Sequence, residues 1–267
     1  MKNYDYIIIG SGFGGSVTAL RLAEKGYSVL VIEKGKWYHA EDFPKTNWNL
    51  RKWIWLPSLG YYGIMKMTFY RHIGILSGTG VGGGSLVYAN TLPIPKPKFY
   101  QNGTWADLAD WQTELAPHYK TAQKMLGSAL NPKLEAGDNI LKDLAVNRNQ
   151  SKQFNPTEVS VFFGEPEVEV DDPYFNGDGP RRTGCIHCGA CMTGCRHNAK
   201  NSLDKNYLYL AQKLGVEIIS EQEVYDVVPK GNLDGSEGYL IKSKSATKFI
   251  KQHQSFAAGN VIFSGGV

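Results

Sequence analysis

A glycine-rich turn near the start of the chain has the residue types and spacing of a nucleotide-binding site. Gly10-Ser11-Gly12-Phe13-Gly14-Gly15 follows an apolar run, and an acid, Glu33, lies eighteen residues after the last glycine. In such a motif the first glycine makes a tight turn, the second admits a pyrophosphate, and the third lets a helix pack closely on a strand. The carboxylate at the end of the next strand accepts the ribose hydroxyls. We therefore predict a dinucleotide site at Gly10, Gly12, Gly14, Gly15 and Glu33.

The four cysteines of the chain form a second group of residues that could do chemistry. They are Cys185, Cys188, Cys191 and Cys195, in the spacing C-x2-C-x2-C-x3-C. This spacing is typical of thiolates that bind an iron–sulfur cluster, although Arg196 stands where a proline usually follows. We predict one cluster, a three-iron cluster or a 4Fe–4S cluster completed by Cys195 or a nearby histidine. Tetrahedral zinc and reduced structural cysteines are the alternatives.

The elements that would position the glycine-rich turn form one βαβ unit. Asp5 to Ile9 is an apolar run that predicts a buried strand, and the stretch from Ser16 to Lys25 has the spacing of an amphipathic helix. Gly26 ends that helix, and Ser28 to Ile32 predicts a second strand that ends at Glu33. Free N–H groups at the helix start would bind the pyrophosphate.

A second glycine cluster follows a long region with many aromatic residues that we interpret as an irregular lid or entrance loop. The cluster runs from Gly78 to Ser85 and is followed by the apolar residues Leu86, Val87 and Tyr88. Dense glycine allows the main chain to lie against a flat or charged ligand. Because apolar residues flank the run, we interpret it as a ligand-binding segment and not as a flexible linker.

The segment from Val81 to Val87, taken with the N-terminal unit, resembles the FAD-binding half of the glucose-methanol-choline oxidoreductases, most of all their cholesterol-oxidase-like branch. The resemblance implies FAD and not NAD as the cofactor. It places Gly82, Gly83, Gly84 and Ser85 near the flavin, and the backbone of Val224 against the adenine. The family usually has asparagine three residues after the motif serine. This chain has Tyr88 there and Asn90 two positions later, so Asn90 is our candidate flavin contact.

The resemblance also suggests how the chain is divided. Residues 1–97 would be the first part of an FAD-binding domain, 98–205 an inserted substrate or cap region that contains the cysteines, and 206–267 the return segment. Within the insert, helices are predicted around Trp105 to Leu126 and Asn139 to Asn147. The overall prediction is an α/β fold: a Rossmann-like βαβ domain with an antiparallel meander and a partial inserted domain.

The return segment is predicted to contain one helix and five strands. The helix spans Asn206 to Leu214, and the first strand spans Val216 to Ile219. Val224 to Val228, Tyr239 to Lys242 and Phe249 to Ser255 alternate between apolar and polar residues, which predicts a three-stranded meander. Asn260 to Phe263 then predicts a separate buried strand.

Composition excludes several functional classes. The net charge is only +4 and no block of lysine or arginine occurs, so we expect no nucleic-acid partner. No stretch is apolar enough to span a membrane, because Trp53 to Tyr70 is interrupted by proline, glycine and lysine. The chain enters its first strand without a secretory signal, which favours the cytoplasm. Attachment of Trp53 to Tyr70 to a membrane surface is the alternative location.

The function implied by the resemblance is oxidation of a small hydrophobic alcohol, including sterol-like alcohols, by hydride transfer to FAD. If a cluster is present, the electron acceptor would be a protein or a quinone. The family's catalytic histidine and its partner would lie beyond residue 267, so we assign no catalytic residue and expect a truncated chain that is inactive alone. Two alternatives remain: an electron-transfer flavoprotein subunit with an iron–sulfur cluster, and a dinucleotide-binding module without redox activity.

Overall fold

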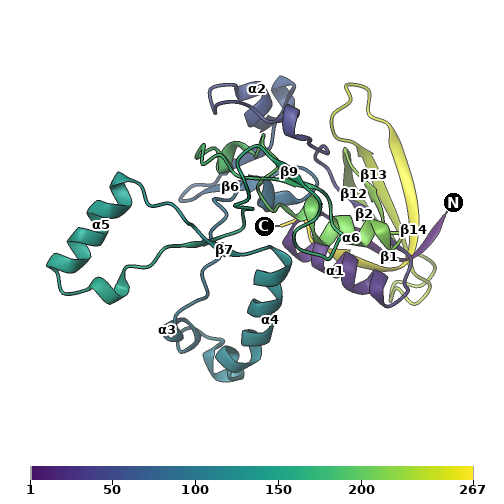
Figure 1. The fold of residues 1–267 in the computed structure, drawn as a ribbon. Coiled ribbons are helices and arrows are strands. Elements are labelled where there is room, and N and C mark those ends of the chain that lie inside the picture. The colour runs from purple at the N-terminus through teal and green to yellow at the C-terminus, as the bar shows by residue number, and fades with distance from the viewer. Residues whose placement is uncertain (1, 267) are drawn as a thin grey trace.

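A six-stranded sheet, in the order β11-β2-β1-β14-β13-β12, forms the centre of the molecule in the computed structural model, which describes residues 2–266 (Figure 1). β1 (Asn3–Ile9) lies parallel to β2 (Val29–Ile32) and to β14 (His253–Phe263), and β11 (Glu217–Ile219) lies parallel to β2. β12 (Gln222–Pro229) and β13 (Tyr239–Ser245) continue the sheet in antiparallel pairs. Strands from both ends of the chain thus share one sheet, and the predicted α/β fold is confirmed.

The parallel strands are buried on both faces. On one face, α1 (Phe13–Glu24) and α6 (Tyr207–Lys213) pack in a cluster that includes Ile8 and Val31. On the other face, Ile7 and Ile32 pack against Ile241 of the meander, and β12 approaches β2. Successive side chains of a strand point to opposite faces, so a strand covered on both sides needs an unbroken apolar run. The run from Tyr6 to Ile9 meets that requirement.

The last strand differs from the prediction. We expected a meander strand over Phe249 to Ser255 and a separate parallel strand over Asn260 to Phe263, but β14 is one strand of 11 residues. Its first half pairs antiparallel with β13, and its second half pairs parallel with β1. The small residues Ala257 and Ala258, which are buried between the two neighbouring strands, allow it to continue without a break. Phe249, by contrast, is fully exposed.

The region between β2 and the second glycine cluster consists mostly of short elements. They are η1 (Ala40–Asp42), α2 (Leu50–Trp53), β3 (Trp55–Leu56), η2 (Pro57–Leu59), β4 (Tyr61–Tyr62), β5 (Met65–Phe69) and β6 (Gly74–Gly78). The hairpin of β5 and β6 was not predicted, and it leads directly into the glycine cluster. Ile64 and Met65 share one buried cluster with Leu86 and Val87, which connects this region to the segment that follows the second glycine cluster.

The helices of the next region extend away from the sheet (Figure 1). They are α3 (Pro97–Tyr100), α4 (Trp111–Met125) and α5 (Ala136–Asn147), with the short 3-10 helices η4 (Ala106–Leu108) and η5 (Ser151–Gln153). Both long helices were predicted, but α4 begins later than expected because Asp110 caps it, accepting from the backbone N–H of Thr113. No residue of α4 or α5 is buried, so neither helix forms a core of its own.

Two short strand pairs connect this region to the cysteines: β7 (Ala129–Leu130) with β8 (Glu158–Val159), and β9 (Glu169–Val170) with β10 (Arg182–Thr183). The 3-10 helices η6 (Cys191–Thr193) and η7 (Leu203–Lys205) follow before α6. Across residues 2–266, each helix is too short or too polar to cross a lipid bilayer.

Candidate functional site

The glycine-rich turn between β1 and α1 has one tightly packed side and one open side. Gly10 has a φ of +99°, and a Cβ there would lie 2.5 Å from the carbonyl oxygen of Ser264. A Cβ at Gly15 would overlap the carbonyl oxygen of Gly10. At Gly12, in contrast, a Cβ would meet no atom within 4 Å. Two glycines are therefore needed to build the turn, whereas Gly12 presents bare backbone to open space.

The start of α1 offers free hydrogen-bond donors beside that open space. The helix begins after Gly12, and the N–H of Ser16 donates to the carbonyl oxygen of Gly12 over 2.9 Å. The N–H groups of the preceding first turn have no partner inside the helix. Together with the helix dipole, these donors favour an anion such as a pyrophosphate. Gly14 lies in this first turn, where a Cβ would be 3.5 Å from Ser264 Oγ.

Glu33 is buried, and its side chain hydrogen-bonds to the glycine-rich turn. Its carboxylate accepts hydrogen bonds from Ser11 N (3.0 Å), Ser11 Oγ (2.7 Å) and Gly35 N (2.8 Å). Ser11 Oγ in turn accepts from the backbone N–H of Gly82 (3.1 Å). Ser11 therefore connects the predicted ribose-binding acid to the second glycine cluster. Sequence reasoning assigned no role to Ser11, although its place inside the motif was a signal.

The two glycine clusters are in direct backbone contact. A Cβ at Gly83, which has a φ of +52°, would lie 2.7 Å from the Cα of Gly12. A Cβ at Gly84 would lie 3.9 Å from the ring of Phe13. Within the second cluster, Ser85 Oγ donates to the carbonyl oxygen of Gly82 (2.7 Å) and accepts from Leu203 N (3.0 Å). The fold thus brings together two segments that are about seventy residues apart in the sequence.

Asn90 and Tyr88 follow the second cluster and carry buried polar atoms. Asn90 is 1% exposed, has a φ of +66°, and its Oδ1 has no hydrogen-bond partner within the described residues. The Tyr88 hydroxyl is also without a partner in that part of the chain, and burial raises the pKa of Tyr88 to about 12. A buried acceptor without a donor is costly, so Asn90 is suited to a ligand that donates a hydrogen bond.

Val224 lies near the other end of the site, on β12. The strand begins next to Glu33, because Gln222 N donates to the carbonyl oxygen of Glu33 over 2.9 Å. The register of β12 shifts between Val224 and Asp226, which marks a β-bulge. Val224 therefore lies on a strand that starts beside Glu33, the predicted ribose-binding acid.

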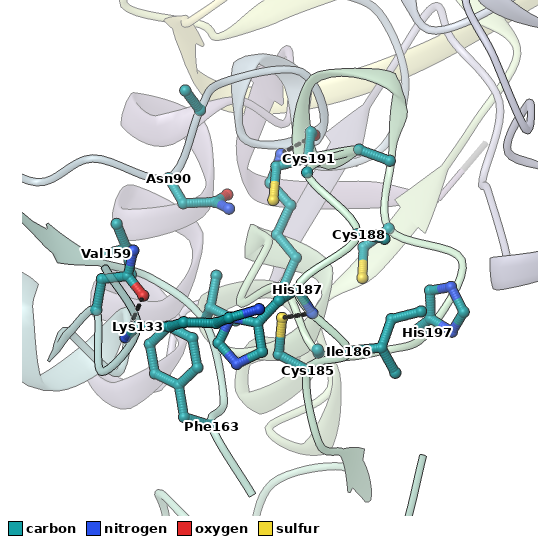
Figure 2. A pocket seen from close by; sticks show the side chains of 18 of the residues that line it. Asn90, Lys133, Val159, Phe163, Cys185, Ile186, His187, Cys188, Cys191 and His197 are labelled. Atoms are coloured by element: carbon teal, nitrogen blue, oxygen red, sulfur yellow. Dashed lines mark hydrogen bonds between the residues drawn. The ribbon is translucent and has the colours of Figure 1, made fainter. Parts of the chain in front are cut away.

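The four cysteines line one cavity of about 260 Å³, together with Asn90, His187 and Lys200. Figure 2 shows the sulfur atoms of Cys185, Cys188 and Cys191 around it. Burial raises the pKa of the Cys185 and Cys191 thiols, whereas Cys188 is exposed. Within residues 2–266, no group of three or more histidine, cysteine, aspartate or glutamate side chains is arranged to hold a metal ion.

The structure therefore does not support the iron–sulfur and zinc interpretations of the cysteine run. Two of the cysteines, Cys185 and Cys191, have backbone groups that bond to different neighbours. Cys185 N donates to the carbonyl oxygen of Phe162 (3.0 Å), and the ring of His187 stacks on Phe163. The carbonyl oxygen of Cys191 instead accepts from Lys200 Nζ (2.9 Å).

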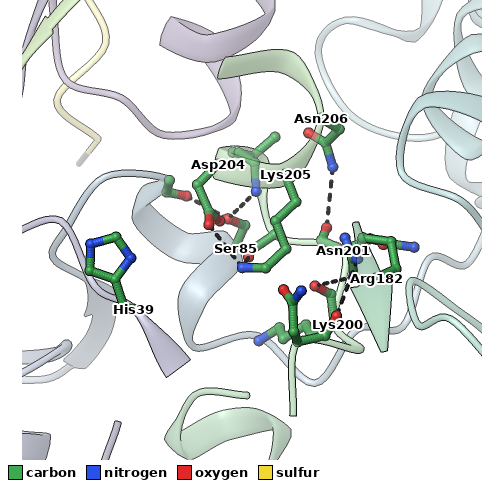
Figure 3. A network of polar contacts seen from close by, with 12 residues as sticks. His39, Ser85, Arg182, Lys200, Asn201, Asp204, Lys205 and Asn206 are labelled. Atoms are coloured by element: carbon green, nitrogen blue, oxygen red, sulfur yellow. Dashed lines mark hydrogen bonds and ion pairs between the residues drawn. The ribbon is translucent and has the colours of Figure 1, made fainter. Parts of the chain in front are cut away.

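A buried polar network lies beneath the second glycine cluster (Figure 3). Arg182 is 1% exposed, and its guanidinium donates to the carbonyl oxygens of Asn198 (3.2 Å) and Lys200 (2.9 Å). Asp204 pairs with Lys205 over 2.8 Å. Burial opposes the charged form of Asp204, but Lys205 holds the pKa of this carboxyl below its ordinary value. This network was not predicted, because its residues show no periodic pattern in the sequence.

Comparisons with known proteins agree with this geometry. The chain matches a family model described as GMC oxidoreductase over residues 4–267. A cholesterol oxidase of Acinetobacter baumannii is 51% identical over 269 residues, which cover 98% of this chain and 48% of that protein. A cholesterol oxidase of Mycobacterium tuberculosis (strain H37Rv) is 53% identical over 271 residues, which cover 99% of this chain and 46% of that protein. The chain thus spans about half the length of these relatives.

A solved structure supports the fold at a greater evolutionary distance. A fungal aryl-alcohol oxidase superposes on the whole chain with a TM-score of 0.51 at 18% identity, and the match covers 46% of that enzyme. At this identity the likeness is evidence for the fold alone.

Proposed function

The chain belongs to the GMC oxidoreductase family, whose members are FAD-dependent oxidoreductases, and we propose that its two contacting glycine clusters form a single cradle for FAD. The observation that carries the proposal is the close approach of the two clusters: a Cβ on Gly83 would lie 2.7 Å from the Cα of Gly12, whereas a Cβ on Gly12 itself would meet no atom within 4 Å. A ligand with a pyrophosphate at its centre and a flat ring at one end suits such a cradle.

Each residue of the cradle has a proposed role. Gly10 and Gly15 shape the turn, and Gly12 and Gly14 present backbone to the pyrophosphate. Glu33 accepts the ribose hydroxyls with the lone pairs that Ser11 and Gly35 leave free, since a carboxylate has about four acceptor sites. Backbone at Val224 contacts the adenine. Gly82, Gly83, Gly84 and Ser85 lie along the flavin, and Asn90 accepts a hydrogen bond from it.

Bound FAD would supply a hydride acceptor for the oxidation of an alcohol, and the hydroxyl proton would pass to a base that this chain does not supply. The residues of this chain would bind and orient the cofactor. For the whole protein we propose a small hydrophobic alcohol as substrate, which the names of the cholesterol oxidases and of the long-chain-alcohol oxidase of Arabidopsis thaliana support. The proposed electron acceptor is molecular oxygen, a quinone or another protein. A protein of the full length of these relatives would be needed to measure turnover.

We also propose the division of the chain given above, with residues 98–205 as an inserted substrate or cap region between two parts of the FAD-binding domain. The projection of α3, α4 and α5 away from the sheet supports it, as does the return of β11 to β14 into the sheet of β1. The cytoplasm is the proposed location, supported by four unpaired cysteines. Attachment of Trp53 to Tyr70 to a membrane surface is the alternative location. Trp55, Ile64 and Met65 in this segment are buried, but Leu59, Phe69 and Tyr70 are exposed.

An electron-transfer subunit with an iron–sulfur cluster is the second candidate function, and the spacing of the cysteines favours it. The experiment that separates the two candidates is a visible absorption spectrum of the anaerobically purified chain, with iron and flavin measured on the same sample. Flavin bands without stoichiometric iron support the FAD cradle alone. Flavin with about one cluster per chain supports the electron-transfer function. A chain that binds no flavin contradicts both.

A further inference from the structure

Lys200 is a buried charged residue that the proposed cofactor cradle does not use. It lies between two loops: the cysteine loop (residues 185–195) and the Asn90 turn (residues 86–90), which continues from the second glycine cluster. Its side chain is 2% exposed. Burying an ammonium group is costly unless all of its donors are satisfied, so a lysine in this position requires an explanation.

The ammonium group of Lys200 satisfies its three donors with three backbone carbonyls. Nζ donates to Leu86 O (3.0 Å) and Tyr88 O (2.9 Å) in the Asn90 turn, and to Cys191 O (2.9 Å) in the cysteine loop. It also lies 4.7 Å from the centre of the Tyr88 ring, within range of a cation–π contact. No other standard side chain provides three donors on one atom.

The backbone of Lys200 is itself fixed. Its carbonyl oxygen accepts from Arg182 Nη2 (2.9 Å), and Asn201 N donates to Ser160 O (2.9 Å). Ser160 N donates in turn to the carbonyl oxygen of Asn90 (2.9 Å). The Asn90 turn is therefore held at both ends, by Lys200 at its start and by Ser160 at its end. Figure 2 shows the Asn90 amide facing the cavity beside Cys191.

We propose that Lys200 is a positioning residue, which ties the cysteine loop to the Asn90 turn and thereby holds the Asn90 amide in place for the cofactor. The proposal rests on the proposed function in one respect, that Asn90 contacts the flavin. It gives the cysteine loop a structural role: the loop supplies the Cys191 carbonyl that completes the set of acceptors around the ammonium group. Without Lys200, Leu86 O and Tyr88 O lose this donor, and Cys191 O keeps only the long contact from Gly194 N (3.4 Å), so the direct bonds between the two loops are lost.

The test compares Lys200→Met, which keeps the length of the side chain but removes the charge and donors, with Lys200→Arg, which keeps a cation with several donors. Lys213→Met is a matched control, because Lys213 is exposed and pairs with Asp178 far from the cavity. Ile241→Val is a second control that lowers the stability of the sheet core without touching either loop. The first readout needs no cofactor: the rate at which a thiol reagent labels Cys191, measured by peptide mass spectrometry.

Loss of the Lys200 charge raises the pKa of the Cys191 thiol, so labelling rates are compared per thiolate. On that basis Lys200→Met should raise the labelling rate of Cys191 by about tenfold or more, since loss of a buried charge-assisted contact has at least that effect on local opening. Lys200→Arg should give an intermediate rate, and both controls should stay near the wild-type rate. An unchanged rate in Lys200→Met would overturn the proposal. So would an increase that Ile241→Val reproduces, because the effect would then be one of global stability.

The second readout is the dissociation constant of FAD in a double-mutant cycle of Lys200→Met and Asn90→Ala. If Lys200 acts through Asn90, the double variant should weaken binding by less than the product of the two single effects. Independent effects would overturn the positioning role. If the wild-type chain binds no FAD, the proposed function fails, while thiol labelling still decides whether Lys200 joins the two loops.

If Lys200→Met does not fold, hydrogen exchange of the wild-type chain tests whether Lys200 joins the two loops. The amides of Val87 and Tyr88 and those of Thr193 and Gly194 should then open with the same free energy, because one ammonium group holds both loops. Opening of the two loops with clearly different free energies would overturn the proposal.

Discussion

Replacement of Glu33 by glutamine tests the connection between the two glycine clusters. The carboxylate of Glu33 accepts two hydrogen bonds at Oε2, both from Ser11, and one at Oε1, from Gly35. An amide has only one oxygen, so its NH2 group must face either Ser11 or the N–H of Gly35. If the amide oxygen replaces Oε2 and keeps both bonds from Ser11, the bond from Gly35 is lost and the amide NH2 faces the Gly35 N–H in a buried site.

The expected loss of stability for Glu33→Gln is about 2–4 kcal/mol, since a hydrogen bond to a buried charged group contributes ~1.5–3 kcal/mol and an unsatisfied donor adds its own cost. The assay is urea unfolding of the chain without cofactor, followed by circular dichroism, with FAD affinity measured on the same variants. Glu24→Gln is the matched control: Glu24 pairs with Arg21 on the surface, where both side chains are well exposed, and an exposed pair contributes ~0.2–1 kcal/mol.

If Glu33→Gln unfolds at the same urea concentration as the wild type, the carboxylate does not hold the turn and the reasoning is wrong. A loss of stability equal to that of Glu24→Gln would have the same meaning. If stability falls but FAD affinity does not, Glu33 supports the turn without binding the ribose.

Three further predictions use other parts of the chain. Gly12→Ala should fold with nearly wild-type stability, because a Cβ there meets no atom within 4 Å. The same variant should bind FAD about tenfold or more weakly. Equal FAD affinity would show that the open side of Gly12 is not the pyrophosphate site. Gly15→Ala should instead prevent folding or lower stability by more than about 2 kcal/mol in urea unfolding, because its Cβ overlaps the Gly10 carbonyl oxygen, and a stable variant would contradict the packing. Burial opposes the charged form of Asp172, but four backbone N–H groups hold the pKa of its carboxyl below the ordinary value. The Asp172 carboxylate should therefore contribute about 1–3 kcal/mol to the free energy of unfolding above pH ~4, and this contribution is lost as pH falls through the folded-state pKa. In urea unfolding, Asp172→Asn should be less stable than the wild type at neutral pH but equally stable in acid. A difference that stays constant with pH would refute this assignment.

The sequence was most informative where local patterns and tertiary packing agree. The run from Asp5 to Ile9, the glycine-rich turn and the acid at position 33 form a βαβ unit with bounds close to those observed. A strand covered on both faces must be apolar throughout, and a turn this tight requires glycine, so both features are visible in the residue types. The second glycine cluster was recognised for the same reason.

The sequence was less informative where a residue's role depends on partners far along the chain. Arg71 and His72 turn the hairpin of β5 and β6, but neither is typical of a tight turn, so the hairpin was not predicted. Ala257 and Ala258 lay between two predicted strands, but in the structure they are in the middle of β14. Lys200 contacts residues more than a hundred positions earlier, and nothing in its neighbours indicates burial.

The cysteines show what a strong spacing signal leaves undetermined. The spacing predicts thiolates that converge on one cluster, but it cannot show how the loop is held. In the structure Phe162 bonds to the backbone of Cys185 and Lys200 to that of Cys191, and the thiols line a cavity without forming a metal-binding group among residues 2–266. The spacing therefore indicates that the four cysteines lie close together, but it does not determine what they bind.

The central claim, that two glycine clusters form one FAD cradle, is tested most directly by titrating the cofactor-free chain with FAD and following flavin fluorescence, with ADP, riboflavin and NAD as competitors. The account predicts saturable binding of one FAD per chain, strong competition by ADP, and weak competition by riboflavin and NAD. Binding of NAD as tight as that of FAD, or no binding of FAD to a folded chain, would contradict it.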